Sequence, residues 1–178
     1  MWKWTRKSSV VLLAVVVLAV GMACTSEENL GPSTDQPSES LTSTLSATLG
    51  SLHLLSCSAQ PYLATSKVIG TQGGTIVVGT HELVIPAGAL AQSVTIKAEQ
   101  VSGSVNSVRF SPEGLQFAKP ASLTLSYQNC SPLLGVLKRV AYTDERLRIL
   151  ELIPSLDNLF SKDVTGSIRH FSRYAVAW

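Results

Sequence analysis

Charged and aromatic side chains are both scarce in this chain of 178 residues: 15% are Asp, Glu, Lys or Arg, and 6% are Phe, Trp or Tyr. Soluble domains average about 25% charged residues. Three of the 14 basic residues, Lys3, Arg6 and Lys7, lie at the N-terminus, and from residue 24 onward 11 basic and 12 acidic side chains give a net charge of −1. Nucleic-acid binding needs a concentrated basic face, and single-strand binding also needs stacking aromatics. The composition therefore argues against a nucleic-acid partner.

The chain also lacks an apolar run long enough for a transmembrane helix. Its longest run, Val10 to Val20, has 11 residues, whereas a helical span needs about 20. Basic residues precede this run, and the small segment Gly21-Met22-Ala23 follows it. A positive region, a short apolar region and small residues at a cleavage point predict a secretory signal peptide over residues 1–23.

Cys24 directly follows the small residues, an arrangement that resembles the lipobox of bacterial lipoproteins. The resemblance implies that cleavage falls between Ala23 and Cys24 and that the thiol of Cys24 is then diacylated. The alternative is an ordinary signal peptide in which Cys24 is an incidental thiol. The lipoprotein interpretation predicts a protein exported to the bacterial cell envelope and held to a membrane by the lipid on Cys24.

Residues 24–56 are expected to form a flexible tether after the anchor. From Thr25 to Ser51 there are 12 Ser or Thr in 27 residues, and no Lys or Arg occurs between Lys7 and Lys67. A segment of this composition has too little apolar surface to fold by itself. The tether would hold a folded domain, residues 57–178, away from the membrane.

Cysteine is rare, with three residues in all, and two remain if Cys24 carries lipid. An exported protein meets oxidising conditions, which favour a disulfide between Cys57 and Cys130 over two free thiols. The sequence has no Cys-x-x-Cys and no Cys/His cluster, so neither a metal site nor a cofactor is expected. His53 and His81 are isolated and are expected at surface or hydrogen-bonded positions.

The region after Cys57 has the pattern of short β-strands. Ser93–Ala98 and Ser122–Tyr127 alternate polar and apolar residues, which is typical of strands with one buried face. Further β-rich runs are Thr75–Val78, Leu83–Ile85, Val105–Phe110, Val136–Tyr142, Leu147–Ile153 and Ser167–Ala177. Pro154 argues against a helix over Leu147–Phe160. Many short strands with regular turns predict an all-β fold, an antiparallel β-sandwich.

Four segments in order resemble the ZU-five domain of zonula occludens proteins, netrin receptors and ankyrins, which also occurs in exported bacterial proteins. They are Ile69–Thr75 (IGTQGGT), Leu83–Leu90 (LVIPAGAL), Phe110–Leu123 (FSPEGLQFAKPASL) and His170–Tyr174 (HFSRY). The resemblance implies a β-sandwich that serves as a docking or structural module. The glycines and prolines of these segments suit strand ends and turns.

His170-Phe171-Ser172 matches a triplet at which some eukaryotic ZU-five proteins cleave themselves. The resemblance implies that Ser172 attacks the carbonyl of Phe171 in an N-to-O acyl shift, with His170 as general base. In a regular strand, residues two apart are about 6.6 Å from each other, so cleavage needs a kink at this point. The alternative is that Phe171 packs in the core and the triplet has no chemistry.

The sequence thus favours a non-enzymatic, membrane-anchored module with an unidentified protein partner, and no small-molecule substrate is inferred. The second hypothesis is a self-processing protein that uses His170 and Ser172 once.

Overall fold

The computed structural model describes residues 52–131 and 135–178, and these residues form strands, turns and loops without a helix. The prediction of an all-β fold is confirmed. No helix that could cross a membrane is found within these two stretches. The predicted signal peptide, Cys24 and the tether up to Ser51 lie outside the described residues.

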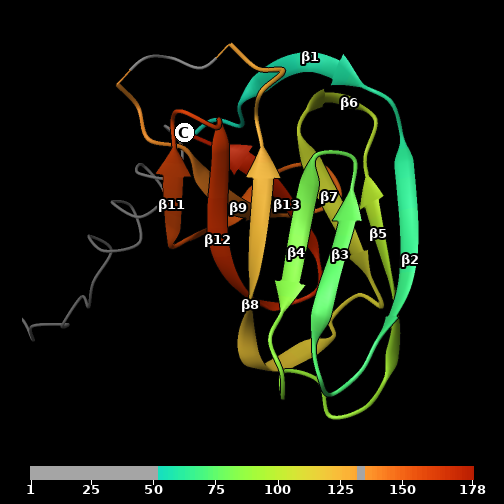
Figure 1. Cartoon of the computed structure of the whole chain (residues 1–178). Helices are drawn as coiled ribbons and strands as arrows, with labels where there is room; N and C mark the ends of the chain where they lie inside the picture. The colour runs from blue at the N-terminus through green and yellow to red at the C-terminus, as the bar shows by residue number, and fades with distance from the viewer. Residues whose placement is uncertain (1–51, 132–134) are drawn as a thin grey trace, which may run out of the picture. The chain divides into compact units, whose positions relative to one another are not determined.

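The strands form two large antiparallel sheets and one small one (Figure 1). The six-stranded sheet, in spatial order, contains β10 (Ile149–Ile153), β9 (Arg139–Thr143), β13 (Arg173–Ala177), β7 (Ser107–Ser111), β5 (Val94–Gln100) and β2 (Leu63–Ile69). The five-stranded sheet contains β11 (Ser155–Asn158), β12 (Asp163–His170), β8 (Gln116–Ser126), β4 (His81–Ile85) and β3 (Gly74–Val78). The small sheet pairs β1 (Ser56–Gln60) with β6 (Gly103–Val105).

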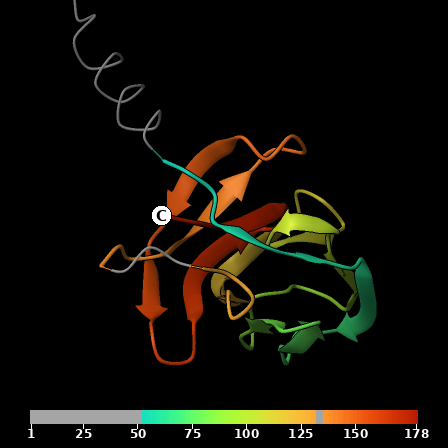
Figure 2. The same cartoon turned by 90° about the horizontal axis from the view of Figure 1, so that it is seen from above.

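The two large sheets pack face to face as a sandwich, and their strands lie in two layers when seen from above (Figure 2). Alternate residues of each strand point into the space between them, as the alternating sequence predicts. The six-stranded sheet contributes Ile96, Phe110 and Tyr174 to the core, and the five-stranded sheet contributes Leu83 and Leu123, all fully or almost fully buried. One continuous apolar core therefore holds the sheets together.

One sequence expectation about the strands is wrong. Ser167–Ala177 is not one strand, because it is divided at Phe171–Ser172 between β12 and β13, which belong to different sheets. Strand β13 lies inside the six-stranded sheet, because it pairs with both β9 and β7. Strands β1, β2 and β11 were not predicted, because their exposed residues weaken the alternation of polar and apolar side chains.

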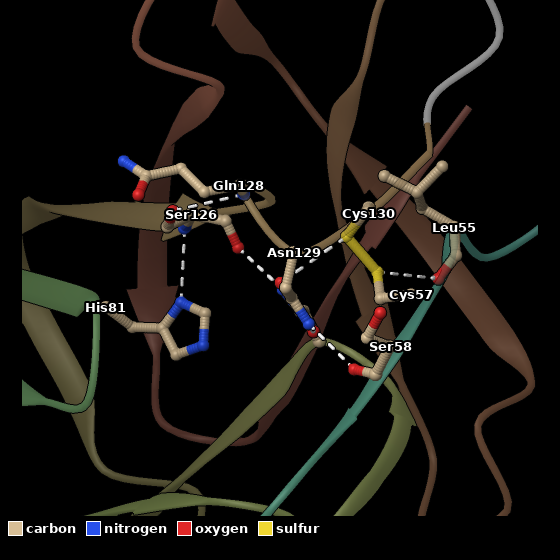
Figure 3. Close-up of a disulfide and its surroundings, with 9 residues drawn as sticks. Leu55, Cys57, Ser58, His81, Ser126, Gln128, Asn129 and Cys130 are labelled. Atoms are coloured by element: carbon tan, nitrogen blue, oxygen red, sulfur yellow. Dashed lines mark hydrogen bonds between the residues drawn. A yellow bond between two sulfur atoms is a disulfide. The ribbon is translucent and has the colours of Figure 1, made fainter.

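The predicted disulfide is present: Cys57 in β1 is bonded to Cys130, which follows β8 (Figure 3). Ser58 N–H donates to Asn129 O at 3.0 Å, and Asn129 Nδ2 donates to Ser58 O at 2.8 Å. Asn106, just after β6, donates through Nδ2 to Asn129 Oδ1 and to Ser126 O. The disulfide and these amides fasten the small sheet to the end of β8.

His81 is not at the surface but lies in β4 with 1% of its area exposed. Its Nδ1 accepts a hydrogen bond from Ser126 N–H at 3.1 Å (Figure 3). Its Nε2 has no hydrogen-bond partner among the described residues. Burial lowers the pKa of His81 from 6.5 to about 4, although Asp163 acts in the opposite direction. The imidazole is therefore neutral in the folded protein at neutral pH.

The disulfide closes a loop between residues 73 positions apart. In the chain-entropy model, closing a loop of that length lowers the entropy of the unfolded chain and so raises the free energy of unfolding by about 4 kcal/mol. We expect the double variant Cys57→Ser/Cys130→Ser to lose that free energy of unfolding, measured by urea denaturation. Cys24→Ser is the matched control and should leave it unchanged. Equal unfolding free energies for the double variant and the parent would contradict this prediction.

The buried neutral His81 should make the fold sensitive to mild acid. Because its pKa is lower in the folded than in the unfolded chain, the unfolded chain takes up the extra proton as the pH falls below 6.5. Stability present at pH 7 should thus decline by about 2 to 3 kcal/mol by pH 4.5.

Denaturant titrations at the two pH values measure this decline. His81→Asn keeps an acceptor for Ser126 N–H and should flatten the decline, whereas His53→Asn, at an exposed histidine, serves as the control. A decline of the same size in His81→Asn would show that other groups cause it.

Candidate functional site

The His170-Phe171-Ser172 triplet lies where the chain passes from one sheet of the sandwich to the other. His170 is the last residue of β12 in the five-stranded sheet, and Arg173 is the first residue of β13 in the six-stranded sheet. Phe171 and Ser172 belong to neither strand, and the backbone bends at Ser172. The kink that self-cleavage would need is therefore present at this bond.

Phe171 packs in the core, as the non-catalytic interpretation expected. Its side chain is fully buried. The ring stacks on Phe110 at a centroid distance of 5.3 Å and meets Phe117 edge-on at 5.0 Å. Such aromatic pairs add about 0.5–1.5 kcal/mol each beyond the area they bury. The crossing between the sheets is thus fixed by three packed aromatic rings: Phe171 itself, Phe110 of β7 and Phe117 of β8.

The backbone of Phe171 is held on both sides by the turn that precedes β8. Its N–H donates to Leu115 O at 2.8 Å, and its carbonyl oxygen accepts from Gly114 N–H at 3.0 Å. The same carbonyl oxygen lies 3.5 Å from His170 Nδ1. A backbone N–H aimed at the carbonyl of an acyl-transfer site is the group that stabilises a developing oxyanion. The Phe171 carbonyl therefore has one such donor in place.

His170 is enclosed by two tyrosines. Tyr142 meets its ring edge-on at a centroid distance of 5.0 Å. The Tyr174 hydroxyl donates to the His170 carbonyl at 2.7 Å and lies 3.4 Å from His170 Nδ1. Burial raises the pKa of Tyr174, so its phenol stays protonated and remains a donor at neutral pH. The tyrosines hold the imidazole beside the Phe171 carbonyl.

Ser172 is buried, with 7% of its area exposed, yet it reaches the wall of a surface pocket of about 310 Å³. The other lining residues are Glu113, Tyr142, Thr143, Asp144, Glu145, Arg146, Arg148 and Leu150. Among the described contacts, no hydrogen bond joins Ser172 to His170, whose Nδ1 faces Phe171 O and Tyr174 instead. Proton transfer from Ser172 would require the imidazole to turn or a water to bridge the two groups.

Charged groups beside the triplet are engaged with one another. On the outer face of the six-stranded sheet, Glu99 accepts hydrogen bonds from Lys97 Nζ at 2.7 Å and from the Tyr62 hydroxyl, which together with Arg109 lower its pKa to about 2. Arg109 also pairs with Glu145 at 3.2 Å. The charges of Lys97, Glu99, Arg109 and Glu145 are therefore balanced by ion pairs among these four side chains.

The sequence singled out the triplet but did not identify the groups around it. Gly114 and Leu115 belong to the Phe110–Leu123 segment, whose residues were interpreted as a turn alone, and Tyr142 was part of an expected strand. No pattern in the sequence links positions 114 and 171, because the contact depends on how the two sheets pack. The other predicted site residue, Cys24, lies outside the described residues.

Within residues 52–131 and 135–178, no group of three or more His, Cys, Asp or Glu is placed to hold a metal ion. No family model and no curated protein matches the chain.

Proposed function

We propose that this chain is a membrane-anchored bacterial lipoprotein, exported to the cell envelope, that presents a ZU-five-like β-sandwich as a non-catalytic interaction or structural module. Its anchor is the lipid on Cys24, and its partner is an unidentified protein. The tether expected over residues 24–56 ends earlier than the sequence predicts, because Leu55 is buried in the core and β1 begins at Ser56. The observation that carries the proposal is the order of the N-terminal features: a basic and apolar leader, a cysteine after small residues, and a Ser/Thr-rich segment before the sandwich.

The disulfide between Cys57 and Cys130 supports export. Structural disulfides persist in oxidising compartments and are rare in the cytosol. The scarcity of charge after residue 24, with a net charge of −1, gives no support to a nucleic-acid function.

The lipid anchor is tested by Cys24→Ser. We expect the parent chain to incorporate radiolabelled palmitate and to fractionate with membranes, and the variant to lose both. Cys57→Ser is unsuitable as a control because it breaks the disulfide, so Ser26→Ala serves instead. Unchanged labelling and membrane fractionation in Cys24→Ser would refute the lipoprotein proposal.

A second function, self-processing at the Phe171–Ser172 bond, is favoured by one observation: the Gly114 N–H already donates to the Phe171 carbonyl at a bend between strands. Ser172 Oγ would attack the Phe171 carbonyl carbon while His170 takes the hydroxyl proton. The proton then passes to the leaving nitrogen, the peptide C–N bond breaks, and an ester with a free amine on Ser172 remains. Water would hydrolyse that ester to the Phe171 carboxylate and the Ser172 hydroxyl.

Intact mass under denaturing conditions tests this second function. If the bond is cleaved, the parent loses the peptide Ser172–Trp178 from its mass and Ser172→Ala does not. His170→Ala should slow the loss, because the general base is gone, and Ser167→Ala is the matched control on β12. A full-length mass for the parent, unchanged after long incubation, would exclude self-processing.

A further inference from the structure

The turn between β11 and β12 carries the most exposed large apolar side chain of the described residues. Phe160 has 102% of its reference area exposed, Leu159 has 57%, and Leu156 on the outer side of β11 has 80%. Strand β11 is an edge strand of the five-stranded sheet. We name Leu156, Leu159 and Phe160 the apolar tip.

The apolar tip is held in place by its own turn. Asn158 Oδ1 accepts the backbone N–H groups of Phe160 and Ser161, at 3.1 and 3.3 Å. Gln128 Nε2 donates to Ser161 O at 3.1 Å, and Tyr127 N–H donates to Lys162 O at 2.8 Å. A turn tied to its own strand and to the segment after β8 presents Phe160 outward as a fixed feature.

Further apolar surface lies beside the tip. The backbone N–H of Lys138 donates to Asp157 Oδ2 at 2.8 Å, so the segment before β9 lies against β11. Leu137 in that segment is 65% exposed. Leu137 therefore adds exposed apolar surface near β11, on the face to which Asp157 points and not the face of Leu156.

The described chain begins at this same end. The β11–β12 turn, the start of the described chain and the C-terminus all lie at the upper end of the sandwich in Figure 1, although the view from above places the turn on the opposite side of that end from the other two (Figure 2). His53 N–H donates to Trp178 O at 3.3 Å, which joins the first described residues to the C-terminal strand. The segment that leads from Cys24 thus enters the domain at the end that carries the tip.

We propose that the apolar tip inserts into the outer layer of the bilayer to which Cys24 anchors the chain. The inference rests on the proposed lipid anchor. From Cys24 to Leu52 the chain has 28 steps, and a flexible linker of that length has an end-to-end distance of about 30 Å. A domain of this size is itself about 30 to 40 Å across, so the attached end stays near the bilayer without stretching the linker.

A lipid surface suits the tip better than a groove in a protein. The turn has its Phe160 and Ser161 N–H groups and its Ser161 and Lys162 carbonyls already paired. Its apolar side chains are exposed, as are those of interfacial membrane anchors before they bind a bilayer. Attachment at Cys24 also raises the local concentration of bilayer to the level at which weak insertion becomes favourable. Charge contributes little, since the segment from Ser155 to Asp163 has one basic and two acidic residues. Insertion should therefore not depend on anionic lipid.

Tryptophan placed at the tip reports insertion directly. The chain from residue 24 to Trp178 is attached to phosphatidylcholine vesicles through a hexahistidine segment in place of Cys24 and a nickel-chelating lipid, so the test does not require native lipidation. On the vesicles, Phe160→Trp should emit at shorter wavelength than the same variant in solution, and brominated acyl chains should quench this emission. The parent gives the background of Trp178.

Val68→Trp is the matched control, because Val68 is 64% exposed near the far end of β2, an edge of the other large sheet. Its emission should be neither shifted nor quenched. Adding phosphatidylserine should leave the Phe160→Trp signal unchanged.

Equal emission and quenching at positions 160 and 68 on vesicle-bound protein would overturn the inference and leave the lipid anchor untouched. A blue shift without quenching, together with concentration-dependent self-association, would assign the tip to a second copy of the chain and also overturn it. If the parent chain takes up no palmitate in cells while Phe160→Trp is still quenched on vesicles, the lipid anchor is refuted and insertion of the tip is supported.

Discussion

The sandwich depends on the burial of Phe171 at the point where the chain leaves one sheet and enters the other. Its ring lies between Phe110 and Phe117, and its N–H and carbonyl are both paired with the Gly114–Leu115 backbone. Only two residues separate β12 from β13, so this crossing has no slack. Without the ring, packing in the core would no longer fix the residues that lead into β13, the most buried strand of the six-stranded sheet. Truncation of a buried phenylalanine costs about 3–5 kcal/mol.

The four segments that resemble the ZU-five domain meet one another in space. Gly88 N–H donates to Thr71 O at 2.8 Å, so the first two segments pack together, and a Cβ on Gly73 would collide with the Ile85 carbonyl. The third segment reaches the second through Ala118 N–H and the Ala89 carbonyl, at 3.0 Å. The fourth joins the third at Phe171. Gly73 and Gly88 therefore serve contacts between loops as well as turns, which favours the scaffold interpretation of these motifs.

Local patterns predicted the strand content and the disulfide, but not the contacts that define the candidate site. Alternation identifies a strand such as β5, where one face is buried, and it fails for β11, whose outer residue Leu156 is apolar and exposed. For His81 the sequence left a surface and a hydrogen-bonded position open, because burial of a lone imidazole leaves no local pattern, and the structure has the hydrogen-bonded one. The pairing of Gly114 with Phe171 joins positions 57 apart in sequence, and only the packing of the sheets decides which distant backbone groups meet.

The proposed self-processing would not release the C-terminal strand from the fold. Strand β13 is hydrogen-bonded to β9 on one side and to β7 on the other, and every one of its residues is buried. The peptide from Ser172 onward would stay in the sheet after the bond breaks, because the pairing and burial of β13 do not depend on that bond. The fold would keep the apolar tip and the proposed anchor unchanged, so the proposed self-processing at Ser172 and the proposed attachment through Cys24 would be independent of each other.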